Sequence, residues 1–171
     1  TEFAATWRLW FIADVLGLLV VVPLLLSWTE PLFRDNVPRR GLIEVAAWVL
    51  VNGLVTVLIF ENGRWPLLFL IFPFLLLTAI RTGLLGATAA STLVAVLATG
   101  LTIKGFGPIA NLAELSSVQH IQLIQSFVLS VVFSSLLIAA RVAYRELLEK
   151  KLRQQSSISS AALENMSQGL A

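Results

Sequence analysis

The sequence contains no cysteine, and His120 is the only histidine among its 171 residues. Without cysteine there is no disulfide, no thiolate nucleophile and no zinc–sulfur site. A single histidine also argues against a multi-histidine metal or haem site. We therefore expect the chain to hold no metal and no cofactor.

Charged residues are scarce as well. They make up 13% of the chain, and hydrophobic residues make up 57%, whereas a soluble domain carries about 25% charged residues. Too few polar side chains remain to cover a water-facing globule. The net charge of +2 is too small to favour nucleic acid as a partner. The composition predicts an integral membrane protein whose main partner is the lipid bilayer.

Long apolar runs divide the chain into membrane-spanning segments. Runs of about 18 apolar residues or more indicate transmembrane helices. The sequence predicts an all-α, polytopic helix bundle over residues 1–140. Its five expected spans lie at about 7–28, 41–60, 65–80, 84–103 and 118–140. The third is short because Pro66 and Pro73 interrupt it, and Arg81, Thr82 and Gly83 form the turn into the fourth.

Basic residues are distributed unequally between the loops on the two sides. Alternating the loops puts nine Lys and Arg on one side and leaves Arg8, Arg64 and Lys104 on the other. The positive-inside rule then predicts a cytoplasmic C-terminus. The first span would start on the outside, although no signal peptide precedes it. Since the chain begins at Thr1, we expect further spans upstream in a longer protein.

A charged, proline-free segment follows the fifth span. Acidic residues precede basic ones by four positions twice within residues 141–162, an arrangement that supports a helix. Tyr144, Leu148 and Leu152 lie along one side of it. The sequence predicts a cytoplasmic linker helix. That helix either forms a parallel homodimer seam or remains solvated without a partner.

Polar residues inside the spans are candidates for sensing, because ionisable groups in a membrane are costly and usually functional. Asp14 is the strongest candidate: it fixes helix packing, senses a ligand or proton, or is an interfacial carboxylate without a functional role. On the fifth span, serines and a glutamine recur every four residues and either pack against neighbouring helices or line a ligand crevice. The candidates for ligand or signal binding are Asp14, Glu44, Asn52, Gln122 and Ser126.

A second group of residues bends or crowds the helices. Pro23 removes a backbone hydrogen bond, and it is either a hinge or a passive kink. Small residues in the fourth span allow helices to approach closely. The hinge and packing candidates are Gly17, Pro23, Pro73, Arg81, Gly83, Gly86, Gly107 and Pro108. No nucleophile–base pair or phosphate-binding loop is present, so we expect no enzyme activity within these residues.

The stretch "WRLWFIADVLGLLVVVPLLLSW" resembles the signature helix of the first class of membrane-associated sensor (MASE) domains. The matching positions are Asp14, Leu16, Gly17, Pro23, Leu24, Leu26 and Trp28. "FPFLLLTAIRTGLLGATAA", "GFGPIA" and "IQLIQSFVLS" are similar to later motifs of the family, in the same order. The resemblance covers about residues 7–145. The family usually has about eight spans, and the early ones have no counterpart in these residues. A ligand pocket shared between the two halves of the domain would therefore be only half present.

The end of the chain resembles a second family. "LENMSQGLA", residues 163–171, is similar to the opening of a PAS domain. Together the resemblances imply the sensory part of a bacterial inner-membrane receptor for an unknown small molecule or physical cue. Its output, outside these residues, would make or break cyclic di-GMP or be a histidine kinase. The rival interpretations are a transporter-like protein and a passive membrane anchor.

Overall fold

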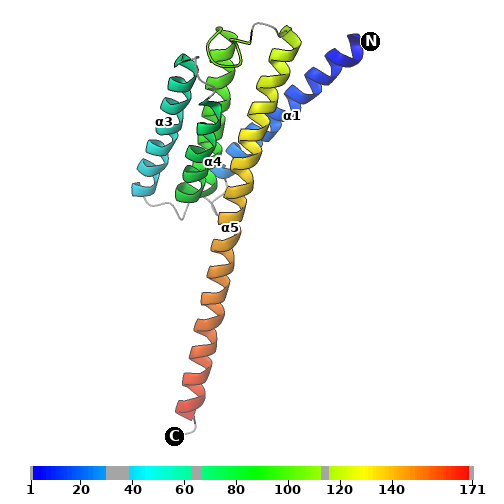
Figure 1. Ribbon diagram of the computed structural model, residues 1–171. Helices are drawn as coiled ribbons and strands as arrows, with labels where there is room; N and C mark the ends of the chain where they lie inside the picture. The colour runs from blue at the N-terminus through cyan, green and yellow to red at the C-terminus, as the bar shows by residue number, and fades with distance from the viewer. Residues whose placement is uncertain (1, 30–38, 63–66, 113–115, 170–171) are drawn as a thin grey trace.

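The computed structural model describes residues 2–29, 39–62, 67–112 and 116–169, and every regular element within them is a helix (Figure 1). The predicted all-α class is therefore confirmed. The elements are α1 (Glu2–Thr29), α3 (Arg39–Asn62), the short 3₁₀ helix η1 (Leu67–Leu70), α4 (Ile71–Ile103) and α5 (Ser117–Gly169).

Four helical segments are long and apolar enough to cross a membrane. They are Thr6–Thr29, Gly41–Asn62, Leu67–Ile103 and Ser117–Ser156. The protein is thus a multi-pass membrane protein with four candidate spans where the sequence predicted five. The numbers differ because the third and fourth predicted spans both lie in Leu67–Ile103, which is interrupted only at Gly83.

Gly83 divides α4 into two arms that fold back on each other. Asn52 on α3 bonds to Thr78, and a β-carbon on the next residue, Gly53, would lie 2.9 Å from the Leu93 side chain. In one straight helix, Thr78 and Leu93 would be about 22 Å apart. The reversal occurs at Gly83, whose backbone angles (φ 62°, ψ −150°) are not helical. We call residues 71–82 the first arm and residues 84–103 the second arm (Figure 1).

The hydrophobic core lies where α3, both arms of α4 and α5 meet. Small side chains on the second arm are fully buried and let the neighbouring helices approach closely; examples are Ala87, Ala90 and Ala98. Larger core residues come from the surrounding helices, among them Phe60, Ile71, Leu75, Val131 and Val132. The second arm of α4 is therefore the packing centre of the bundle.

Helix α5 is much longer than the bundle is thick. Its 53 residues span about 80 Å, against about 30 Å for the hydrocarbon core of a bilayer. Figure 1 shows its second half extending beyond the other helices as a single rod. The side chains of Tyr144, Leu148 and Leu152 on this rod are exposed.

Candidate functional site

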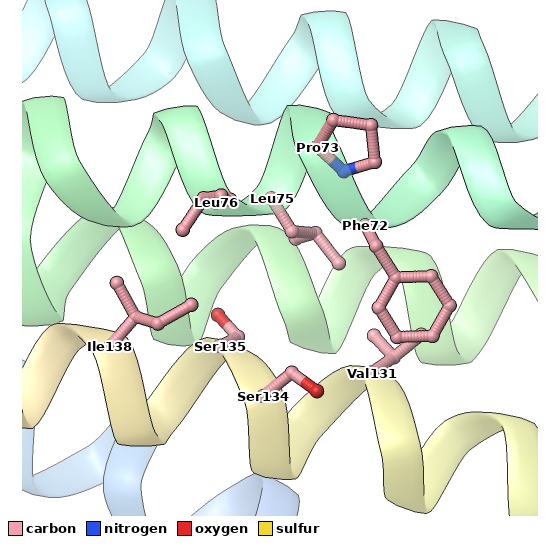
Figure 2. Close-up of a pocket in the computed structure, with 8 residues that line it drawn as sticks. All are labelled: Phe72, Pro73, Leu75, Leu76, Val131, Ser134, Ser135 and Ile138. Atoms are coloured by element: carbon pink, nitrogen blue, oxygen red, sulfur yellow. The ribbon is translucent and has the colours of Figure 1, made fainter.

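An apolar groove lies between the first arm of α4 and α5 (Figure 2). Its volume is about 260 Å³. Phe72 extends from α4 toward Val131 on α5. The lining residues are Phe72, Pro73, Leu75, Leu76, Val131, Ser134, Ser135 and Ile138. Because hydrocarbon dominates this lining, the groove fits a short apolar chain and not a charged solute.

Local sequence explains why the two helices leave this space. Pro73 lies in the first turn of α4, where the missing N–H does little harm to a helix. Opposite it, Ser134 and Ser135 are small for positions in an apolar span. Ser135 donates a hydrogen bond to the Ala87 carbonyl oxygen at 3.3 Å and so fixes α5 to the second arm beside the groove.

The same turn of the second arm also holds α1. The hydroxyl oxygens of Ser27 on α1 and Thr88 on α4 are 2.9 Å apart and share a hydrogen bond. Since Ala87 and Thr88 are adjacent, α1 and α5 are both bonded to one turn of α4. We call Ser27, Ala87, Thr88 and Ser135 the three-helix node. A shift of this turn of α4 would therefore alter its bonds to both α1 and α5.

A second polar contact joins α3 to the first arm. Asn52 is 1% exposed, and its amide nitrogen donates to the Trp48 carbonyl oxygen at 2.8 Å and to the Thr78 hydroxyl at 2.7 Å. Thr78 in turn donates to the Phe74 carbonyl oxygen at 2.8 Å. The Asn52 side-chain oxygen is buried without a hydrogen-bond partner among the described residues. The site holds the helices together but leaves one strong acceptor unused.

The five ligand or signal candidates do not come together in one place. Asn52 is buried between α3 and α4, whereas Asp14, Gln122 and Ser126 are exposed on the outside of the bundle. Glu44 is exposed as well, and its carboxylate lies 3.9 Å from the Arg81 guanidinium. The described structure therefore offers separate polar positions and not one polar pocket.

The glycine and arginine candidates have distinct surroundings. Gly17 is open, with no atom within 4 Å of where a β-carbon would be, while the Thr82 side chain occupies that space at Gly86. Gly107 is buried against the Phe60 ring with φ at 99°, which favours glycine. Gly83 forms the reversal in α4, and Arg81 lies beside it.

The proline candidates lie in three different settings. Pro23 is half-buried inside α1, which continues through it as one helix. Pro73 lines the groove. Pro108 is half-buried in the segment after α4.

Several polar contacts were not anticipated from the sequence. They involve Ser27, Thr78, Thr88, Ser135 and Gln125, whose amide nitrogen donates to the Leu9 carbonyl oxygen at 3.4 Å. A hydroxyl in an apolar helix can bond to its own backbone, so its presence alone carries little signal. The small residues around Gly86 were the one available clue to the importance of this part of α4.

Comparison with known proteins places the chain in a family. Among the described residues, no three His, Asp or Glu side chains gather as a metal site would require. No curated protein and no solved structure matches the chain. The MASE1 family model, however, matches residues 1–146, which include the whole bundle and the first part of α5. The residues resembling a PAS domain lie outside this match. The chain therefore belongs to the MASE1 family of membrane sensor domains.

Proposed function

We propose that this domain is the sensory input of a bacterial inner-membrane receptor and that α5 relays changes in bundle packing to a cytoplasmic output domain. One observation carries this proposal. Helix α5 forms part of the bundle core and then continues beyond it without a break. A shift or rotation of α5 inside the bundle would thus be transmitted along a single rigid rod.

The bundle offers a physical basis for two packings close in energy. Contacts between membrane helices through hydrogen bonds contribute only about 0.6 kcal/mol on average. The three-helix node depends on two such bonds, and the adjoining groove leaves space beside α5. A cue that binds one packing better than the other would shift the balance between them. Asp14, Pro23 and Gln122 are further candidates for residues that bias it.

The direction of signalling follows from the distribution of basic residues. The excess of Arg and Lys on the C-terminal side supports a cytoplasmic end for α5. There it would lead into a PAS domain at residue 163 and then into a cyclic di-GMP enzyme or a histidine kinase. Two copies would pair in parallel along Tyr144, Leu148 and Leu152, since an apolar stripe on a helix in water favours a partner.

A fusion of the full chain to a diguanylate cyclase catalytic domain tests the relay. Ser135→Leu should change cyclic di-GMP production several-fold, because a large side chain displaces α5 from Ala87. Val96→Ala, on an exposed part of the second arm, is the matched control and should leave production unchanged.

The same fusion separates the proposal from a passive anchor. Replacing residues 1–140 by unrelated spans should abolish the effect of any cue and fix production at one level. Equal production by the wild-type fusion, the Ser135→Leu variant and the replacement would contradict a relay. Net solute flux across vesicles containing the chain would instead indicate a transporter.

A further inference from the structure

The side of α1 that faces away from the bundle is a continuous surface in its own right. Its residues are spaced three or four apart, so they lie on one side of the helix. All are exposed. This outer face of α1 consists of Trp7, Trp10, Phe11, Asp14, Gly17, Leu18, Val21, Leu25 and Trp28.

Asp14 lies at the centre of this face and points directly away from the other helices. Among the side chains of α1 whose burial is described, the two buried ones are Leu16 and Ser27. With about 100° between successive residues, both lie roughly 200–220° around the helix from Asp14, on the opposite side. Half-buried Ile12 and Pro23 follow the same side as Leu16. A rotation of α1 that buried Asp14 against this bundle would expose Leu16 and Ser27.

A carboxyl group in this position lacks what a membrane requires. Asp14 lies about 12 Å along the helix from Thr6 and about 22 Å from Thr29, the ends of the apolar segment. It is therefore inside the hydrocarbon layer, where carboxyl groups normally pair with a donor. The described residues provide it with no hydrogen bond and no ion pair. Its side chain is also too short to reach the interface, as Lys or Arg would.

The turn after Asp14 is open to close approach. A β-carbon on Gly17 would have no atom within 4 Å, and the position is exposed. Small residues on membrane helices let a second backbone come near. Large apolar side chains on either side, Phe11 and Leu18 among them, would cover the flanks of a helix seated there.

From these observations we propose that the outer face of α1 binds a further transmembrane helix that carries a basic side chain at the depth of Asp14. The carboxyl group selects the cation, and Gly17 lets it approach. A second copy of α1 fits less well, because copies in one membrane are parallel and symmetry would place two Asp14 carboxyl groups together. Binding at this surface can be tested without the relay proposed for α5, although Asp14 is also a candidate for biasing the packing that α5 relays.

Binding of a designed helix in lipid vesicles tests the proposal. The probes are a polyleucine helix with one central lysine and the same helix without it, both labelled with a fluorescent acceptor. The full chain carries the donor on Lys104→Cys, which is a unique site because the sequence has no cysteine. The lysine helix should bind at least tenfold more tightly than the leucine helix. Asp14→Leu and Asp14→Asn should remove most of that difference, and Gly17→Leu should weaken binding of the lysine helix.

A relocated carboxyl group controls for attraction by any membrane aspartate. Leu50 on α3 is 70% exposed, so the double variant Asp14→Leu/Leu50→Asp presents the same charge on another helix. It should bind the lysine helix more weakly than the wild type. Equal binding would overturn the proposal, as would equal affinity of the two probes for the wild type. Self-association that needs Asp14 in the absence of any probe would assign the face to a second copy and overturn it as well.

Discussion

Helix α4 and helix α1 are both predominantly apolar, yet they relate to the bundle in opposite ways. The second arm of α4 buries Ala87, Ala90 and Ala98 completely, and α3, α5 and the first arm pack around it. Of the described side chains of α1, only Leu16 and Ser27 are buried.

The difference lies in side-chain size. Small residues on α4 let neighbouring backbones approach, and without a hydrophobic force between helices in lipid, such close packing is what holds a bundle together. Helix α1 meets the bundle with larger side chains, among them Ile12, Leu16 and Leu19, and contacts it along a narrow strip. High hydropathy therefore identifies a span but does not say whether it is central or peripheral.

Matched alanine-to-leucine substitutions should give the largest contrast between the two helices. Ala90→Leu adds bulk to the fully buried second arm and should lower the free energy of unfolding by about 3 kcal/mol, the upper end for overpacking. Ala13→Leu on exposed α1 should change it by less than about 0.5 kcal/mol. Unfolding by SDS in mixed micelles measures both, and similar losses would contradict a central α4 and a peripheral α1.

Two glycines sharpen the contrast at the level of the backbone. Gly83→Ala places a side chain at φ 62°, ψ −150°, a region nearly restricted to glycine, and should cost about 2 kcal/mol. Gly17→Ala on α1 is helical and open, and should stabilise the helix by about 0.5–1 kcal/mol. The same SDS titration measures the predicted loss of stability at Gly83 and the predicted gain at Gly17. A loss at both positions would show that α1 is packed more tightly than the structure indicates.

The hydrogen bond between Ser27 on α1 and Thr88 on α4 should have a smaller but measurable effect on the free energy of unfolding. Ser27→Ala and Thr88→Val each remove one side of the 2.9 Å contact. A double-mutant cycle should give a coupling of about 0.6 kcal/mol, the average for such bonds between membrane helices. A coupling of zero would mean that each hydroxyl bonds only to its own backbone and that α1 is held by packing alone.

Much of the architecture could be predicted from the sequence, and most of the contacts could not. Hydropathy identified the membrane spans because the bilayer requires long apolar runs, and Gly83 was recognised within the turn between two of them. The count of five differs from four helices because Leu67–Ile103 counts as one segment, although the non-helical backbone of Gly83 reverses the direction of α4 within it. Length and composition are local properties, so they can be read directly.

The pairing of side chains depends on how helices rotate against each other, which no single run encodes. Asn52 was recognised as a polar residue in a costly place, but its partner Thr78 lies 26 residues away. The sequence predicts that the polar stripe of α5, formed by Gln122, Ser126, Ser130 and Ser134, either packs against neighbouring helices or lines a ligand crevice. Instead Gln122, Ser126 and Ser130 are exposed, and Ser135, one residue after the last of the series, makes the buried contact.

The weakest expected effect concerns the ion pair between Glu44 on α3 and Arg81 on α4. The Glu44 and Arg81 side chains are 46% and 64% exposed and 3.9 Å apart, so solvent and salt screen them. Arg81→Gln should change the free energy of unfolding by no more than about 0.5 kcal/mol, far less than Ala90→Leu in the same helix. The difference should also vanish at about 1 M salt. A loss above about 1 kcal/mol that persists in salt would mean that charge, and not only the small residues of α4, holds this side of the bundle.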